Sequence, residues 1–194
     1  MRKARYRSTM AEIERTIESP RLTLEPQRSA HAEAMFEVLS DPAIYEHENA
    51  PPKSLQWLLE RYAKLETRRS SGDGSELWLN WVLRERSAST LIGYVQATVH
   101  ADGHALVAYE LGSAHWGRGL GSEAVTALIN ELGSQYGVHT VLAIFKRSNR
   151  RSRRLLEGLG FASPGPERAL RWLVQTDEDL LLRHVAGTPA EASP

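Results

Sequence analysis

The fold is decided by residues 108–124, which read AYELGSAHWGRGLGSEA. An apolar run ends at Leu111, and a glycine-spaced turn then opens a helix with one apolar face. That face consists of Val125, Leu128, Ile129 and Leu132. Without side chains at Gly117, Gly119 and Gly121, a bulky anion can approach main-chain N–H groups at the start of the helix. The stretch therefore predicts a phosphate cradle made of a strand, a glycine-rich turn and a helix N-terminus.

Three classes of protein use such a cradle: P-loop nucleotide hydrolases, dinucleotide-binding folds and acyl-CoA enzymes. A P-loop needs Lys followed by Ser or Thr after its last glycine, and no such pair follows Gly121. The dinucleotide motif places Gly-x-Gly-x-x-Gly near the first strand of a domain, whereas these glycines alternate past the middle of the chain. A glycine-rich turn without a ligand stays open on this stretch alone.

A second motif, NRRSRRLLEGLGF at residues 149–161, follows an apolar run typical of a buried strand. Together the two stretches resemble the GNAT N-acetyltransferase superfamily. Residues 116–121 match its acetyl-CoA pyrophosphate loop, Gln/Arg-x-x-Gly-x-Gly/Ala, and residues 149–161 match Asn-x-x-Ser-x-x-Leu-x-Glu-x-Leu-Gly-Phe. Trp116 replaces the usual Gln or Arg, as is familiar in the branch that resembles ribosomal-protein N-terminal alanine acetyltransferases. The resemblance covers about residues 17–183.

The resemblance implies an α/β (α+β) fold: a mixed, mostly antiparallel central sheet with helices on both faces. Residues 105–111 and 140–145 are expected to form its parallel pair, since a helix between consecutive strands implies a right-handed crossover. In the family these two strands splay apart after a bulge and hold the cofactor. Its pantetheine arm pairs with strand main chain, which assigns Leu111 and Ser113 to that pairing.

Periodicity and capping signals predict the other elements. Helices are expected at residues 29–39 and after the N-cap Ser54, and strands at residues 76–84, 91–100, 169–174 and 179–183. The expected organisation is a flexible extension over residues 1–16, one acetyltransferase domain over 17–184 and a flexible tail over 185–194.

The composition excludes several classes of function. Lys+Arg and Asp+Glu are balanced at 24 each, so no net field favours nucleic acid or an anionic membrane. The absence of cysteine excludes disulfides, thiolate zinc sites and a cysteine nucleophile. No apolar run approaches the ~20 residues of a membrane span, and no signal-peptide core follows the basic N-terminus. A cytoplasmic protein is expected, and no metal, because neither motif contains a cluster of metal ligands.

The resemblance implies acetyl-CoA as the cosubstrate. The residues assigned to its binding are Leu111, Ser113, Gly117, Arg118, Gly119, Leu120, Gly121, Ser122, Asn149, Ser152 and Arg153. Arg150, Arg153 or Arg154 would meet the anionic nucleotide end of coenzyme A. Six of the nine residues over 146–154 are basic, so this run also resembles an arginine-rich RNA-binding segment. RNA binding stays a minority alternative because the net charge is neutral.

Acetyl transfer to nitrogen needs a neutral amine, a polarised thioester carbonyl and a donor to the departing sulfur. In many relatives a tyrosine one residue before the Glu of the second motif is that donor, but this sequence has Leu156 there. The resembled branch can use the serine instead, which points to Ser152. Glu110 is the first candidate for the general base because it lies on the central strand beside the cradle. The alternative bases are His47, His104 and His115.

The acceptor pocket is expected to be walled by the segment over residues 44–52, with Tyr45, His47 and Glu48 as candidates for substrate contact. Protein N-termini, free amino acids, polyamines and aminoglycoside-like amines all stay open as acceptors. Without a cysteine to carry the acyl group, direct attack in a ternary complex is expected. The alternative is a non-catalytic domain that binds coenzyme A as a sensor or serves as a protein partner. The resemblance also suggests a homodimer.

Overall fold

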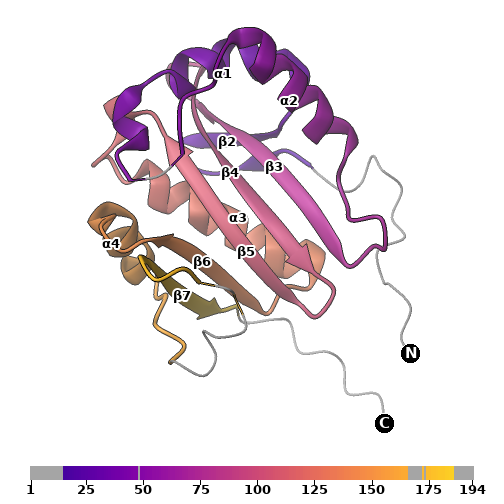
Figure 1. The fold of residues 1–194 in the computed structure, drawn as a ribbon, viewed down its shortest axis with the longest axis vertical. Helices are drawn as coiled ribbons and strands as arrows, with labels where there is room; N and C mark the ends of the chain where they lie inside the picture. Colours follow the sequence, from indigo (N-terminus) through magenta and orange to yellow (C-terminus); the bar gives the residue numbers. More distant parts are fainter. Residues whose placement is uncertain (1–14, 48, 166–171, 173, 186–194) are drawn as a thin grey trace.

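The structure, a computed structural model, describes residues 15–47, 49–165, 172 and 174–185. One seven-stranded sheet runs in the order β1-β2-β3-β4-β5-β6-β7 (Figure 1). The strands are β1 (Ile17–Glu18), β2 (Leu22–Pro26), β3 (Glu76–Glu85), β4 (Thr90–His100), β5 (His104–Leu111), β6 (Thr140–Lys146) and β7 (Glu178–His184). The α-helices are α1 (Ala32–Leu39), α2 (Leu55–Thr67), α3 (Leu120–Tyr136) and α4 (Arg150–Gly158). Short 3₁₀ helices cover Ser29–His31, Pro42–Tyr45 and Ser113–His115.

Every neighbouring pair of strands is antiparallel except β5 and β6, which confirms the expected mixed sheet. The parallel pairing covers only the beginning of each strand and ends at Leu106 and Leu142. Beyond that point β5 stays with β4 as far as Leu111, while β6 pairs with β7 over its full length. Each strand thus follows its antiparallel partner, and the pair splays open at its C-terminal end.

The bulge implied by the resemblance is not found in β5. The register between β4 and β5 runs without a shift from Ala105 to Leu111. The register shift that the sheet does contain lies between β3 and β4, at Leu83 and Arg84. The separation of β5 from β6 therefore comes from their divergent partners and needs no extra residue in β5.

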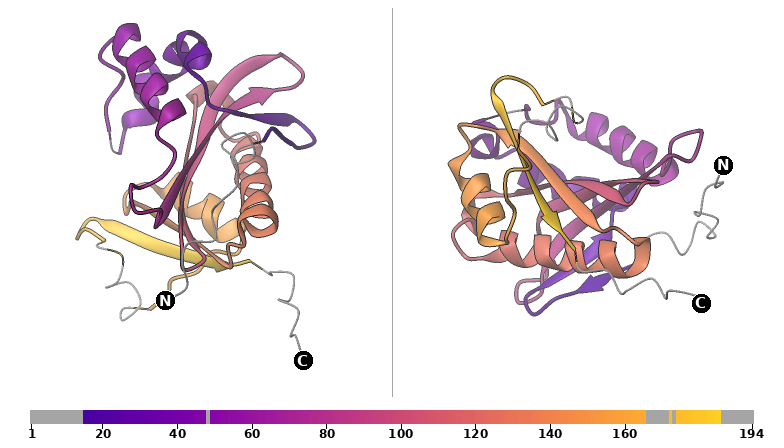
Figure 2. Two further views of the ribbon diagram at one scale, coloured as in Figure 1. Left: turned by 90° about the vertical axis from the view of Figure 1, so that its right-hand side faces the viewer. Right: turned by 90° about the horizontal axis from the view of Figure 1, so that it is seen from below.

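Helices cover both faces of the sheet. The pair α1 and α2 lies on one face and α3 on the opposite face, with α4 near the splayed end (Figures 1 and 2). Strand alternation divides the core accordingly: Trp81 and Leu83 pack in the cluster that includes α3, whereas Val82 packs with α1 and α2. The fold thus has a hydrophobic core on each face of the sheet.

The predicted elements are largely confirmed. The helix predicted at residues 29–39 begins with a 3₁₀ turn and continues as α1. Ser54 caps α2 as expected, because its hydroxyl accepts a hydrogen bond from the Trp57 backbone N–H at 3.1 Å. The strand predicted over residues 169–174 lies mostly outside the described residues.

Both ends of the folded body extend past the expected boundaries. Arg15 lies in the predicted N-terminal extension, but its guanidinium makes two hydrogen bonds with Glu131, at 2.8 and 2.9 Å. Its carbonyl also accepts the Trp81 indole N–H at 2.9 Å. Val185 lies in the predicted tail, yet it packs on the core and donates to the His139 carbonyl at 2.9 Å. These long-range partners could not be read from the local polarity of the termini.

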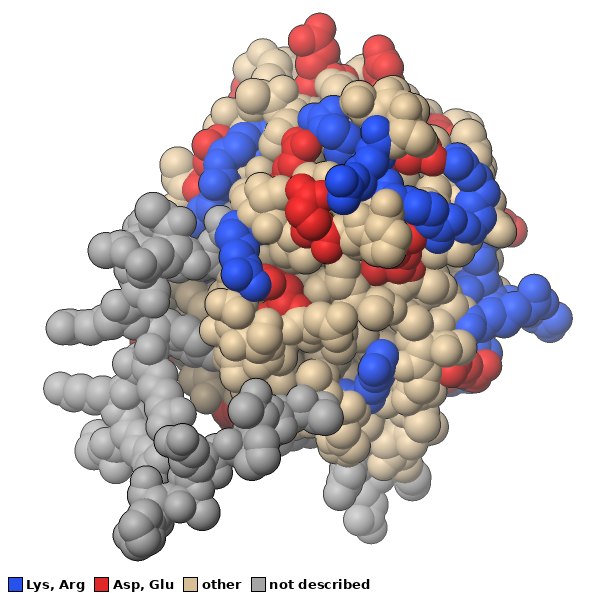
Figure 3. Space-filling view, turned by 180° about the vertical axis from the view of Figure 1, so that it is seen from behind, with Lys and Arg blue, Asp and Glu red and all other residues tan. Residues whose placement is uncertain are grey.

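Charge is mixed on the face that α3 covers, where basic and acidic side chains lie side by side (Figure 3). This mixture agrees with the balanced composition of the chain. Among the described residues, no helix is long and apolar enough to cross a membrane.

Candidate functional site

The glycine-rich turn enters α3 through left-handed backbone. Gly117 has a φ of +71° and Gly119, the N-cap, has a φ of +75°. A side chain at either position would strain the turn. The first hydrogen bond of the helix runs from the Glu123 N–H to the Gly119 carbonyl at 3.1 Å. The amides of Leu120, Gly121 and Ser122 precede this bond and point out of the helix N-terminus, as an anion site requires.

Gly121 is required for a different reason, since its backbone has no positive φ. A Cβ at this position would lie 2.9 Å from Leu155 Cδ1 of α4 and 3.8 Å from Leu111 Cδ1 of β5. The start of α3 is therefore pressed between the end of β5 and α4. The glycine brings the two sequence motifs into contact.

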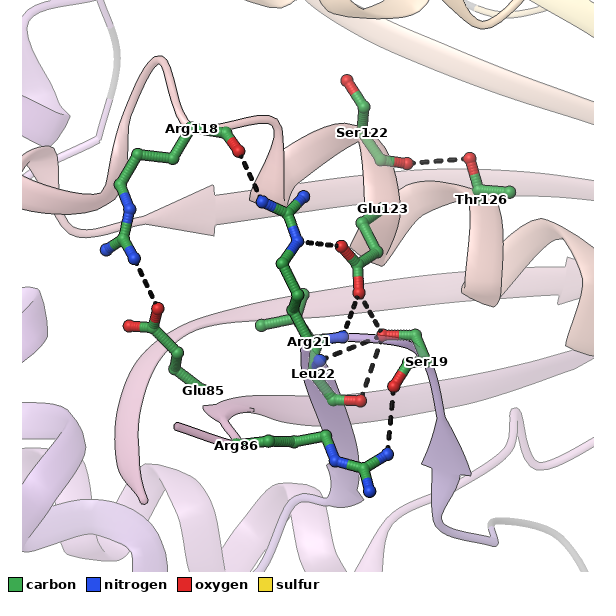
Figure 4. Close-up of polar contacts among 9 residues, drawn as sticks. All are labelled: Ser19, Arg21, Leu22, Glu85, Arg86, Arg118, Ser122, Glu123 and Thr126. Carbon is green, nitrogen blue, oxygen red and sulfur yellow. Dashed lines mark hydrogen bonds and ion pairs between the residues drawn. The ribbon is translucent and has the colours of Figure 1, made fainter. Parts of the chain in front are cut away.

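The turn is held from behind by Arg21, which precedes β2 (Figure 4). Its guanidinium donates to the Arg118 carbonyl at 2.8 Å and to Glu123 at 2.7 Å. Glu123 also accepts the Arg21 backbone N–H and the Ser19 hydroxyl, each at 2.7 Å. Burial alone would raise the pKa of Glu123, but these hydrogen bonds outweigh it and lower the pKa. The carboxylate thus stays ionised and fixes the turn to the sheet.

A cavity of about 280 Å³ opens in front of the turn, between the splayed ends of β5 and β6. Several of the residues assigned to cofactor binding line this cavity. They are Leu111, Gly117, Gly119, Leu120, Gly121, Ser122, Asn149 and Ser152. The two sequence motifs therefore meet around one space, bounded by the strand gap and the N-termini of α3 and α4.

Three of the assigned residues do not line the cavity. The Arg118 side chain turns away and donates to Glu85 at 2.5 Å (Figure 4). Ser113 donates its backbone N–H to Asp41 at 2.9 Å, so that group is already used. Arg153 forms ion pairs with the carboxylates of Asp179 and Glu157. We therefore remove these three side chains or amides from the expected cofactor contacts.

The second motif organises the opposite wall. Asn149 caps α4, since its side-chain oxygen accepts the Ser152 N–H at 3.0 Å. The Ser152 hydroxyl then lies 2.7 Å from the Tyr109 hydroxyl, and both residues line the cavity. Burial raises the pKa of Tyr109 to about 12, against the lowering effect of the Ser152 hydrogen bond. The pair therefore holds its protons at neutral pH and can donate into the cavity.

Trp116, the departure from the usual motif, completes the rim. Its indole N–H donates to the Leu111 carbonyl at 2.8 Å, which ties the turn to the end of β5. The Arg151 guanidinium stacks on the ring, 3.3 Å from its centroid, and both residues line the cavity. This stack holds a cation at the rim beside the glycine turn.

A second cavity, of about 400 Å³, lies on the α1 and α2 side of the sheet. It shares Ala108, Glu110 and Ile144 with the first cavity. Among the described residues, Glu110 is the one carboxylate that lines either cavity. The first-choice base therefore lies where the two spaces meet.

The residues predicted to contact the acceptor substrate do not all lie in the second cavity. Tyr45 lines the second cavity and donates its hydroxyl to the Leu39 carbonyl at 2.8 Å. Burial raises its pKa to about 12, with a further contribution from Glu110. His47 instead lies 3.1 Å from the Ser148 hydroxyl at the start of α4. Glu48 lies outside the described residues.

Two of the alternative general bases, His115 and His104, lie in different places relative to the first cavity. His115 lines the first cavity, but its Nδ1 lies 3.5 Å from Glu85 and 3.3 Å from Arg118, so the ring faces that pair. His104 lies at the beginning of β5, six residues before Glu110, or about 20 Å along a strand. His104 therefore lines neither cavity, whereas Glu110 lines both.

The basic run over residues 146–154 is partly neutralised within the fold. Lys146 lies 3.1 Å from both Asp177 and Glu178, and Arg147 lies 3.3 Å from Asp179. These ion pairs tie β6 and α4 to β7 and the turn before it. They favour a structural role for much of the run over an RNA-binding role.

Sequence reasoning missed Tyr109, Arg151 and Asp41. Tyr109 belongs to the apolar run that ends at Leu111, and strand alternation places it on the α3 face at the gap. Arg151 belongs to the motif but occupies one of its variable positions. Asp41 follows α1 and its partner Ser113 is distant in sequence, so no local signal marks the pair.

Comparison with known proteins decides the family. Residues 21–162 match the model of the acetyltransferase (GNAT) domain. The chain belongs to the GNAT acetyltransferase family. The match contains both motifs and the strands and helices that bound the two cavities.

The relatives and structural neighbours of this GNAT protein are also named as acetyltransferases. The Bacillus licheniformis protein named "Uncharacterized N-acetyltransferase p20" is 26% identical over 156 residues, 77% of this chain and 84% of the relative. A GNAT-family acetyltransferase from Bacillus anthracis has a TM-score of 0.71 at 16% identity, covering 88% of this chain and 98% of that one. RimL, a ribosomal α-N-protein acetyltransferase solved in complex with coenzyme A, has a TM-score of 0.73 at 14% identity, covering 90% and 100%. At such identities the structural matches show the fold.

Proposed function

We propose that this GNAT protein transfers the acetyl group of acetyl-CoA to a primary amine by direct attack in a ternary complex. The observation that carries the proposal is the meeting of the two cavities at Glu110. One cavity has the glycine turn at its wall, and the other is lined by α2 and the segment that precedes it. A donor and an acceptor could therefore approach the same point from opposite faces of the sheet.

The first cavity fits the diphosphate and the thioester arm of acetyl-CoA. The Gly121 amide and its neighbours at the start of α3 suit a diphosphate, and Gly117 and Gly119 let it approach the backbone. In antiparallel pairing, neighbouring residues direct their N–H and C=O groups to opposite sides. Because Gly112 donates to β4, the Leu111 amide faces the gap. Its N–H donates there to the Glu110 carboxylate at 3.2 Å, a bond that a pantetheine carbonyl would have to replace in order to pair with it.

Where the two cavities meet, one group can accept a proton and another can donate one. Glu110 can accept a proton from the amine, which must be neutral to attack. On the other face, Ser152 and Tyr109 form a hydroxyl pair that keeps a proton available at Ser152 Oγ for the departing sulfur. RimL, a structural neighbour, was solved with coenzyme A, which supports the choice of cosubstrate.

The proposal is tested first by calorimetric titration with acetyl-CoA. Parent protein should bind, and Gly119→Glu should not, because a side chain at this positive φ strains the turn and its Cβ would lie 3.4 Å from the Arg21 guanidinium that holds it. Gly119→Ala separates backbone strain at this positive φ from charge. Gly158→Glu is the matched charge control, since a Cβ at Gly158 meets no atom within 4 Å and φ there is not positive. Absence of binding by the parent would refute the proposed function.

A turnover assay distinguishes an acetyltransferase from a domain that only binds coenzyme A. Release of the coenzyme A thiol should require both acetyl-CoA and an amine, and a mass increase should appear on the amine. Tight binding without thiol release across primary amines of every charge class would instead support the sensor alternative.

A further inference from the structure

A groove continues from the acceptor cavity along α2. The acceptor cavity and two further cavities, of about 230 and 290 Å³, all include Arg61 and Leu65 in their walls. The groove ends where Trp78 of β3 faces Arg68 at the end of α2. Its floor is formed by β3, β4 and β5, including Gln96 and Ala108. The acceptor site is therefore elongated and has one reactive end.

The groove is basic over its outer half. Arg61, Lys64 and Arg68 lie three and four residues apart on α2 and so share one face of the helix. All three are exposed, and within the described chain none forms an ion pair. Arg68 lies over Trp78 with its Cζ 4.8 Å from the ring centroid, and Arg61 lies 5.6 Å from the Trp57 ring. The aromatic rings hold two of the cations along the groove.

The acidic residues of α2 point elsewhere. Glu60 accepts a hydrogen bond from Gln56 at 2.8 Å, and Glu66 accepts the Ser29 backbone N–H at 2.8 Å, beside α1. In the described part of the groove, Glu110 at the inner end is the one lining carboxylate. Glu76 lies beside the outer end, where its carboxylate accepts the Trp78 indole N–H at 3.0 Å. The groove thus has one lining carboxylate at the reactive end and three cations beyond it.

The length of the groove suits an extended peptide. Arg61 and Arg68 are seven residues apart, which places them about 10 Å apart along a helix. Glu110 pairs with Tyr94, and Thr98, four residues farther along β4, pairs with Trp78. Four residues along a strand and two strand spacings give about 16 Å between Glu110 and Trp78. An extended peptide covers that distance with about five residues.

Resting on the proposed function, we propose that the acceptor is the N-terminal amine of an acidic peptide segment. The amine lies at Glu110, and carboxylates at about positions three to five meet Arg61, Lys64 and Arg68. The attacking nitrogen forms the bond to the acetyl carbon and loses one proton to Glu110, while the thioester C–S bond breaks and the departing sulfur takes one proton from Ser152 Oγ. An acidic segment binds this row by charge complementarity, which salt weakens.

The test uses amidated peptides in three charge classes. Ala-Ala-Glu-Glu-Glu, Ala-Ala-Gln-Gln-Gln and Ala-Ala-Lys-Lys-Lys, each also with Ser, Thr or Met first, are compared by kcat/KM with acetyl-CoA, alongside spermidine and free glutamate. The acidic class should exceed the neutral class by about tenfold at low salt and the basic class by more. The preference should shrink in about 0.5 M salt, where the screening length is only a few ångström.

Variants connect the preference with the groove. The triple variant Arg61→Gln, Lys64→Gln, Arg68→Gln should raise KM for the acidic peptide about tenfold, bring the ratio of kcat/KM for the acidic and neutral peptides close to one, and leave KM for acetyl-CoA within twofold. Lys64→Gln is paired with Gln56→Glu, which changes the net charge equally on the same helix outside the groove. Gln56→Glu should have no effect on the preference.

The outcomes separate the inference from the proposed function. Equal rates for the three peptide classes, or a preference for the basic peptides or spermidine, would overturn the inference and leave the acetyltransferase proposal standing. Acetylation of small amines with none of any peptide would do the same. A charge preference that survives the triple variant would also overturn it. Failure to transfer acetyl to any amine would remove both proposals.

Discussion

Removing the Glu123 carboxylate tests how the glycine turn is held. In the structure this carboxylate accepts three hydrogen bonds of 2.7 Å, from the Ser19 hydroxyl, the Arg21 backbone N–H and the Arg21 guanidinium (Figure 4). Arg21 in turn donates to the Arg118 carbonyl within the turn. Glu123→Ala therefore removes the acceptor of the exposed Arg21 backbone N–H, leaves the Ser19 hydroxyl its bond with the Leu22 carbonyl at 3.0 Å, and frees the side chain that holds the turn.

The magnitude follows from the burial of each partner. The Glu123 side chain is 13% exposed, but both of its bonds with Arg21 are exposed, so only the Ser19 bond approaches the value of about 1.5–3 kcal/mol that is typical of a hydrogen bond to a charged group. The Arg21 side chain is half exposed, so its ion pair contributes at most about 1 kcal/mol. Because the three bonds share one acceptor and are not additive, we expect Glu123→Ala to cost about 3 kcal/mol of unfolding free energy. Loss of the Arg21 tether should weaken acetyl-CoA binding about tenfold, or ~1.4 kcal/mol.

Urea denaturation measures the first quantity and calorimetric titration the second. Glu157→Ala is the matched control, since its carboxylate is half exposed and meets Arg153 at 3.4 Å within α4. That variant should change the unfolding free energy by less than about 0.5 kcal/mol. Arg21→Ala should reproduce the binding defect with a smaller loss of stability. If Glu123→Ala unfolds within 0.5 kcal/mol of the parent and binds acetyl-CoA equally well, the bracing argument is refuted.

Three further predictions concern the site and its pH response. Glu110→Gln and Ser152→Ala should each lower kcat at least tenfold with unchanged far-ultraviolet circular dichroism; near-parent turnover in either would withdraw that role. Tyr109→Phe should lower kcat less than Ser152→Ala does, with an unchanged dissociation constant for acetyl-CoA; an equal or larger loss would make the tyrosine the donor. Burial lowers the pKa of His31 below 6.5, even beside Glu25, so stability present above pH 6.5 is lost as pH falls and the ring must charge. His31→Gln should remove part of that loss in urea denaturation at pH 5 and 7.5, and an unchanged pH dependence would contradict the assignment.

Local chemistry made much of the fold predictable. Glycines at alternate positions before an amphipathic helix have few explanations, and two of them, Gly117 and Gly119, do adopt positive φ. The N-cap Ser54 and the alternating strands β3 and β4 follow from equally local rules. These features need only a few neighbouring residues, so one sequence is enough to reveal them.

The assigned residues whose side chains do not line the cavity share a different cause. Arg118 and Arg153 lie in motifs near a proposed anion, and a basic side chain there suggests a ligand contact. Their partners are instead Glu85, 33 residues away, and Asp179, 26 residues away. The Tyr109 hydroxyl likewise meets Ser152 across 43 residues. Long-range pairs leave no periodic trace, so these contacts became visible only after the strands were placed.

The proposed division of acid and base chemistry follows from strand alternation. On β5, Tyr109 and Leu111 pack towards α3, while Ala108 and Glu110 line the cavity under α2. In a closed sheet the two sets would be separated by neighbouring strands, and no reactant could contact both. Here β6 leaves β5 after Leu106, so the last residues of β5 border an open gap on one side. The hydroxyl pair and the carboxylate are thereby accessible at a single point while remaining on opposite faces. A shift of β5 by one residue would exchange these faces, which makes its register with β4 as important to the chemistry as the side chains themselves.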